Sequence, residues 1–149
     1  MMHKTVRFFS WLFDKLNTLS FLPILGIRVW IGLVFWRSGK TKIADWAGTV
    51  ALFKDEYKVP VIPPEIAAFL ATSVELSAPI MVILGMGARF GALAMLLMTA
   101  VIEFTYMHFD VHVVWALMLS LIFFQGAGKA SVDYLIKTKG LSHFGKESF

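Results

Sequence analysis

Two apolar runs decide the fold: PEIAAFLATSVELSAPIMVIL at residues 64–84 and FGALAMLLMTAVIEFTYM at residues 90–107. A helix needs about 20 residues to cross the hydrocarbon of a bilayer, so the first run is long enough and the second nearly so. Each run carries one carboxylate where the bilayer is expected, Glu75 in the first and Glu103 in the second. An ionisable group inside a span costs at least ~2.5 kcal/mol on insertion scales. Each carboxylate therefore needs a partner or a water-filled cavity.

The composition indicates a small polytopic membrane protein. The chain has 149 residues, of which 58% are hydrophobic and 16% charged, and its mean hydropathy is +0.72. An ordinary soluble domain is less apolar and richer in charge. The net charge of +4 does not indicate a nucleic acid partner, because the lysines and arginines lie at the ends of apolar runs, where they suit phospholipid headgroups. The lipid bilayer is the partner that this composition predicts.

Cysteine is absent, so the chain cannot form disulfides, thiolate metal sites or iron–sulfur clusters. We expect no haem either, since the four expected spans hold no histidine on the side opposite His108 and His112 to carry electrons across the bilayer. Any redox role would therefore use a bound cofactor or a partner protein.

The pattern of apolar runs predicts an all-α integral membrane four-helix bundle within residues 21–134. The four spans are expected at about residues 21–38, 64–85, 89–107 and 112–127, the last being marginal in length. Residues 1–20 carry aromatic and aliphatic side chains at helical spacing among basic ones, which predicts an amphipathic interfacial helix; an extension of the next helix is the alternative. Residues 39–63 hold a second such pattern, and residues 135–149 form a basic tail.

Positive charges predict the orientation. Eight lysines and arginines lie in the N-terminal segment, the hairpin after residue 84 and the tail, against five in the opposite loop. The rule that cytoplasmic loops are richer in positive charge then places both termini in the cytoplasm. A multi-pass protein of the plasma or inner membrane is expected.

Arg28 and Glu75 are the two charges expected deepest in the bundle. At ~1.5 Å per residue, Arg28 lies roughly 10 Å and Glu75 roughly 15 Å from the same membrane face. These depths predict an ion pair, which would serve either to hold two helices together or to bind a ligand.

A second polar group is expected at the outer rim of the bundle, formed by Glu103, His108 and His112. His108 and His112 have the i, i+4 spacing that can bind a metal on a helix, but a short turn is expected there and no metal is predicted. Trp115 follows on the fourth span, where it offers a flat apolar wall or an interfacial anchor.

Four groups of residues, taken in order, resemble the DoxX family of four-helix membrane proteins. The resemblance covers about residues 24–134, and no single motif in it is specific. The motifs are Arg28, Gly32, Phe35, Gly39 and Lys42 in the first span, Pro64, Glu75 and Gly85-x-x-x-Arg89 across the central hairpin, His112-x-x-Trp115-Ala116 in the fourth span, and Gly126-x-Gly128-x-x-Ser131-x-Asp133 after it.

The resemblance implies an accessory subunit of a membrane oxidoreductase system, as in the small subunit of thiosulfate:quinone oxidoreductase. A quinone or similar lipophilic ligand would then bind within the bundle, with a soluble or membrane redox partner and a homo-oligomer as further expectations. The ligand-binding residues predicted are Arg28, Glu75, Glu103, His108, His112 and Trp115. A quinone carbonyl needs a hydrogen-bond donor, and a quinol needs a proton acceptor. No catalytic residue is assigned, because no nucleophile with a base is present. The alternative function is a non-catalytic scaffold or chaperone that packs against another membrane protein.

Overall fold

The computed structural model describes residues 2–106 and 110–144, with side chains for residues 6–106 and 110–139, and the regular elements of these residues are all helical. This confirms the all-α fold class. The elements are α1 (Met2–Leu19), α2 (Phe21–Ala44), α3 (Trp46–Leu52), the π-helix η1 (Phe53–Tyr57), α4 (Pro64–Leu84), α5 (Ala88–Thr105), α6 (Asp110–Gln125) and α7 (Val132–Phe144).

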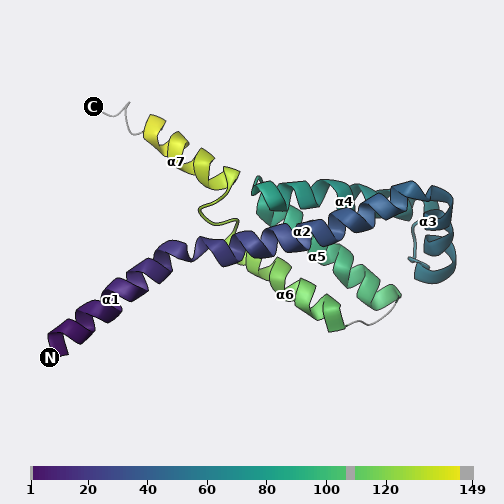
Figure 1. Ribbon diagram of the computed structural model, residues 1–149. Helices are drawn as coiled ribbons and strands as arrows, with labels where there is room; N and C mark the ends of the chain where they lie inside the picture. Colours follow the sequence, from purple (N-terminus) through teal and green to yellow (C-terminus); the bar gives the residue numbers. More distant parts are fainter. Residues whose placement is uncertain (1, 107–109, 145–149) are drawn as a thin grey trace.

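Helices α2, α4, α5 and α6 form one bundle. Along its circumference α2 packs on α4, α4 on α5 and α5 on α6, and α6 also contacts α2 (Figure 1). The interior holds Ile31, Val82, Met95 and Leu119, all fully buried. Other large apolar side chains face outward, as a helical bundle in lipid requires.

Three helical stretches are long and apolar enough to cross a membrane: Val6–Ala44, Pro64–Leu84 and Ala88–Thr105. The 16 residues of α6 are apolar but span only about 24 Å, less than the ~30 Å of a typical hydrocarbon core. These lengths are the ones expected of a multi-pass membrane protein.

The face of α2 that meets α4 follows a regular spacing. Its residues stand four, three, four and three positions apart, the repeat of a coiled-coil seam: Arg28, Gly32, Phe35, Gly39 and Lys42. At Gly39 a Cβ atom would lie 2.9 Å from Leu76 Cδ2 and 3.0 Å from Glu75 Cβ, so only glycine permits this helix approach. Gly39 therefore packs within the helix instead of ending it, and α2 continues past residue 38 to Ala44.

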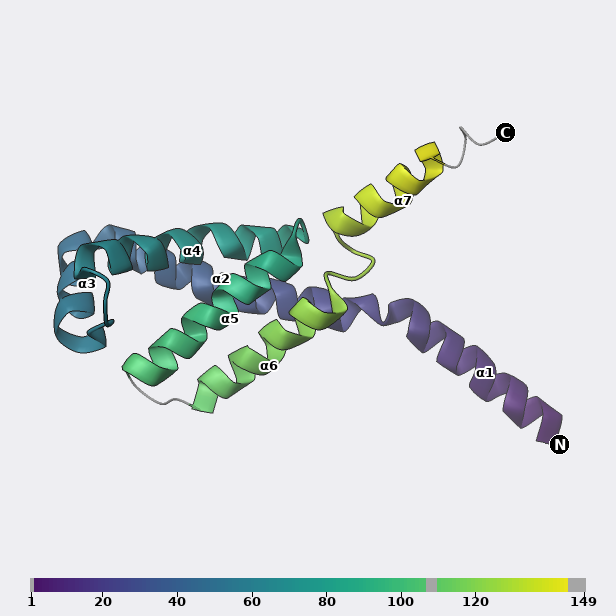
Figure 2. The ribbon, with the colours of Figure 1, turned by 180° about the vertical axis from the view of Figure 1, so that it is seen from behind.

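The remaining elements lie at the two ends of the bundle. α3 and η1 cover one end, where Phe53 packs on Ala67 and Ala68 of α4. α1 and α7 both extend away from the opposite end (Figure 1), and the reverse view shows the same arrangement (Figure 2). The sequence predicted a basic tail at residues 135–149. In the structure, α7 (Val132–Phe144) includes the first ten residues of that segment.

Candidate functional site

The carboxylate of Glu75 on α4 pairs with the ammonium group of Lys42 on α2. Lys42 Nζ lies 2.7 Å from Glu75 Oε1 and 2.8 Å from Oε2, and Ser38 Oγ donates a third hydrogen bond to Oε1 at 3.0 Å. The side chains of Lys42 and Glu75 are only 11% and 3% exposed. Two opposite charges are therefore held inside the bundle, where the ammonium group donates hydrogen bonds to the carboxylate.

The predicted pair between Arg28 and Glu75 is wrong. The buried guanidinium of Arg28 instead donates to four main-chain carbonyls, at 2.6–2.8 Å, those of Val82, Ile83, Ala127 and Ala130. Val82 lies seven residues beyond Glu75 on α4, which is about 10 Å along the helix axis. Arg28 and Lys42 share one face of α2, and the register of α2 against α4 brings Lys42, not Arg28, level with Glu75.

Arg28 joins the end of α4 to the segment that follows α6. The last carbonyls of a helix have no partner within the helix, and Arg28 supplies donors for two of them. At Gly85, which has a φ of +70°, a Cβ atom would lie 2.5 Å from Arg28 Nη2. The Asp133 carboxylate accepts from the backbone N–H groups of Gly87 and Ala88 at the start of α5, at 2.8 and 3.3 Å. The glycine-rich closing motif is thus tied to the α4–α5 turn around a buried arginine.

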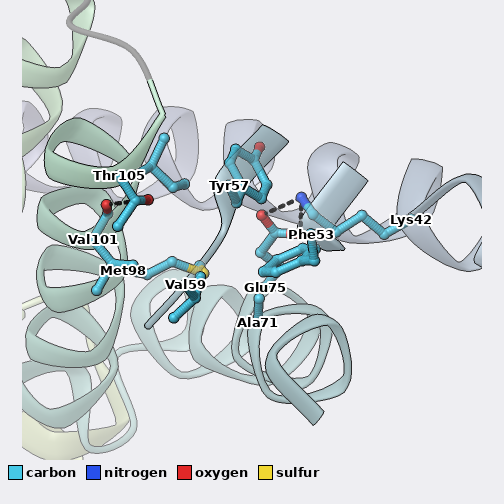
Figure 3. Close-up of a pocket in the computed structure, with 10 residues that line it drawn as sticks. Lys42, Phe53, Tyr57, Val59, Ala71, Glu75, Met98, Val101 and Thr105 are labelled. Atoms are coloured by element: carbon cyan, nitrogen blue, oxygen red, sulfur yellow. Dashed lines mark hydrogen bonds and ion pairs between the residues drawn. The ribbon is translucent and has the colours of Figure 1, made fainter. Parts of the chain in front are cut away.

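Two cavities border the Lys42–Glu75 pair. The larger has a volume of about 170 Å³ and is lined by Val34, Phe35, Ser38, Lys42, Tyr57, Glu75, Ile102, Tyr106, His112 and Trp115. The smaller, of about 40 Å³, lies beneath η1 and is drawn in Figure 3, where Lys42 and Glu75 face each other beside Tyr57. Lys42, Tyr57 and Glu75 line both cavities. A small ligand in either one would touch the charged pair.

Trp115 on α6 lines the larger cavity and has an unused hydrogen-bond donor. Its Nε1 atom is buried, and no acceptor is within reach in the part of the chain that the structure describes. The ring is fixed between neighbours, with centroids 5.5 Å from Phe35 and 5.2 Å from His112. A buried N–H group without an acceptor costs about 1–3 kcal/mol, so an acceptor brought next to this side chain would recover part of that cost.

His112 and Glu103 form a second polar pair beside this cavity. His112 Nδ1 lies 2.6 Å from Glu103 Oε2, and the histidine is buried. His112 lines the larger cavity and Glu103 stands behind it, on α5. A proton held between these two groups is thereby close to any molecule that occupies the cavity.

Tyr57, the last residue of η1, lines both cavities beside the ion pair. Its ring packs edge-on against Phe53 and Tyr106, with centroid distances of 4.8 and 4.7 Å. Burial, together with the nearby carboxylate of Glu75, raises the pKa of Tyr57 above its ordinary value. The phenol therefore stays protonated throughout the physiological pH range and keeps an O–H donor at the cavity.

The structure brings together some of the residues that the sequence indicated. Glu75, His112 and Trp115 line one cavity, Glu103 joins it through His112, and Arg28 lies apart at the opposite end of the bundle. His108 lies outside the described residues.

Sequence reasoning missed four residues of this site that carry polar groups. They are Ser38, Lys42, Tyr57 and Tyr106. The signal for Lys42 was its place in the four-three spacing that begins at Arg28, since that spacing puts it on the same helix face.

Comparison with known proteins identifies relatives over most of the bundle. The DoxX family model matches residues 24–108. An uncharacterized protein of Haemophilus influenzae is 29% identical over 133 aligned positions, which cover 79% of this chain and 85% of the relative. No solved structure matches the chain.

Proposed function

The chain belongs to the DoxX family, and from that premise we propose that its bundle binds a quinone, or a lipophilic ligand with the same hydrogen-bonding groups, beside Lys42 and Glu75. In this role it serves as an accessory subunit of a membrane oxidoreductase system, working with a separate redox partner. The observation that supports the proposal most directly is the unpartnered N–H of Trp115, a residue that lines a cavity of about 170 Å³.

The chemistry of a quinone suits the groups around this cavity. Its carbonyl oxygens are acceptors, and the residues that line the cavity include two donors, the N–H of Trp115 and the hydroxyl of Tyr57. The three N–H groups of Lys42 are already used by Glu75 and Ser38. The reduced form carries hydroxyl groups, for which the carboxylate of Glu75 is an acceptor and His112 a proton carrier. Phe35 and Trp115 supply flat apolar walls.

Trp115→Phe is expected to weaken quinone binding about fivefold, because it removes one hydrogen bond worth about 1 kcal/mol and keeps an aromatic wall. The measurement is calorimetric titration of a short-chain benzoquinone into the purified protein in mild detergent. Trp30→Phe is the matched control, because Trp30 lies 48% exposed on the outer side of α2. No binding to the unmodified chain, or equal affinities for Trp115→Phe and the unmodified chain, would refute the proposal and favour a scaffold.

We also propose that both termini face the cytoplasm. α1, α7 and the α4–α5 turn lie at one end of the bundle, and that end carries most of the positive charge (Figure 1). Since the chain has no cysteine, a single introduced cysteine reports its own side of the membrane. A membrane-impermeant thiol reagent added to intact cells should label Asp55→Cys and leave Ser10→Cys unlabelled. The reverse pattern would invert the orientation.

A further inference from the structure

An apolar groove runs along the outside of the bundle between α4 and α5. It has a volume of about 350 Å³, and its floor and walls include Ala67 and Val74 of α4 and Ala94 of α5. Leu70 and Leu97 stand at its rim, 50% and 60% exposed, so the groove faces the surrounding lipid. No charged side chain lines it.

The groove adjoins the small cavity beneath η1. Five residues line both spaces: Phe53, Val59, Ala71, Met98 and Val101. The small cavity in turn ends on the Lys42–Glu75 pair, as Figure 3 shows, with Met98 and Val59 across from the charged groups. The lipid-facing groove therefore lies next to the cavity that borders the ion pair, with these five side chains between them.

We infer that this groove holds the tail of the ligand whose head binds beside Lys42 and Glu75. The inference rests on the proposed function and adds the class of ligand: a polar, hydrogen-bonding ring that carries a single isoprenoid or alkyl chain. The head enters sideways from the bilayer between α4 and α5, and the chain remains in the groove under Phe53 and Val59. An uncharged lining accepts hydrocarbon and has no group that would bind the phosphate of a lipid.

A second outward groove, between α5 and α6, is a poorer route to the same site. Its volume is about 420 Å³, but it shares no lining residue with the small cavity beneath η1 and only His112 with the larger polar cavity. The paired Glu103 and His112 stand at that junction, and a hydrocarbon chain beside them would bury two polar groups away from water. This groove therefore serves as the control.

The test compares two quinones with the same ring, one with a methyl group and one with a chain of several isoprenoid units. Ala94→Phe fills the groove between α4 and α5 and leaves the polar residues in place. It should weaken binding of the long-chain quinone about tenfold, because the chain loses its packing contacts, and leave the methyl quinone unchanged. Ala100→Phe makes the same change of size on α5 but fills the control groove, and both affinities should stay as in the unmodified chain.

The outcomes separate this inference from the proposed function. If the methyl quinone fails to bind the unmodified chain, the proposed function fails, and the inference with it. If the methyl quinone binds but Ala94→Phe affects both quinones equally or neither, only the tail site is wrong. Native mass spectrometry is the third measurement, because it detects bound phospholipid. A phospholipid that stays bound when the long-chain quinone is added, and that is lost in Ala94→Phe, would assign the groove to bilayer lipid. That result would overturn the inference.

Discussion

Arg28→Met should destabilise the bundle by about 4 kcal/mol or more, since four carbonyls lose their donors and each buried, unpaired polar group costs about 1–3 kcal/mol. In a chain of this size 1 kcal/mol corresponds to about 2–4 °C, so the melting temperature should fall by about 10 °C. The measurement is heating of a fluorescent fusion in detergent, followed by size-exclusion chromatography of the surviving monodisperse protein.

Arg89→Met is the matched control for this substitution. Arg89 is exposed and makes one long hydrogen bond, 3.3 Å from its Nη2 to the carbonyl of Phe124, so its loss should change the melting temperature little. Arg28→Lys should lie between the two, because an ammonium group has three donors and cannot reach four carbonyls from two segments. If Arg28→Met and Arg89→Met have the same melting temperature, the buried arginine does not hold the end of the bundle.

The register of the helices explains what the sequence could predict and what it could not. The four apolar runs, the turn after α4 and the need of Glu75 for a partner all follow from hydropathy and from the cost of a buried charge. The identity of the partner of Glu75 does not follow from the sequence, because Arg28 and Lys42 lie fourteen residues apart on the same face of α2. Choosing between them requires the height of α2 relative to α4.

That height depends on contacts that the sequence does not show. Counting depth from the first apolar residue assumes that α2 begins level with the α4–α5 turn. In the structure Arg28 itself lies beside Gly85 in that turn, so the first residues of α2 extend beyond it. Further along, Gly39 meets Glu75 and Leu76. Arg28 therefore donates hydrogen bonds to the last carbonyls of α4. Lys42, which hydropathy assigns to the loop, pairs with the carboxylate of Glu75.

Site residues contributed by irregular structure were equally hard to predict. Tyr57 ends η1, whose π-helical turn is a local departure from the α-helix that the periodicity of residues 43–57 predicts. Tyr106 lies just after α5 and carries a hydrogen bond from its hydroxyl to Glu56. By contrast His112 and Trp115 were predicted from sequence, His112 as part of the polar rim and both as part of the fourth-span motif. As i, i+3 neighbours they lie on one face of α6.

Glu75→Gln should destabilise the ligand-free bundle by about 3–5 kcal/mol, because it leaves the ammonium of Lys42 buried without an opposite charge. Lys42→Met should cost a similar amount by isolating the carboxylate, for which Ser38 is then the remaining donor in the described contacts. The double variant should recover a large part of the loss, since an apolar or neutral pair carries no uncompensated charge. Melting of the four proteins under identical conditions gives the coupling energy directly.

The controls for this cycle lie on the same two helices. Glu65→Gln and Lys40→Met remove one exposed charge each from α4 and α2, and their effects should be small and additive. Strict additivity of Glu75→Gln and Lys42→Met would contradict the pairing seen in the structure. A coupling energy of several kcal/mol would confirm the pair, and the quinone titration can then be repeated on the recovered double variant. Lost binding in that stable protein would assign the pair a role with the ligand, whereas retained binding would leave it a role in holding α2 to α4.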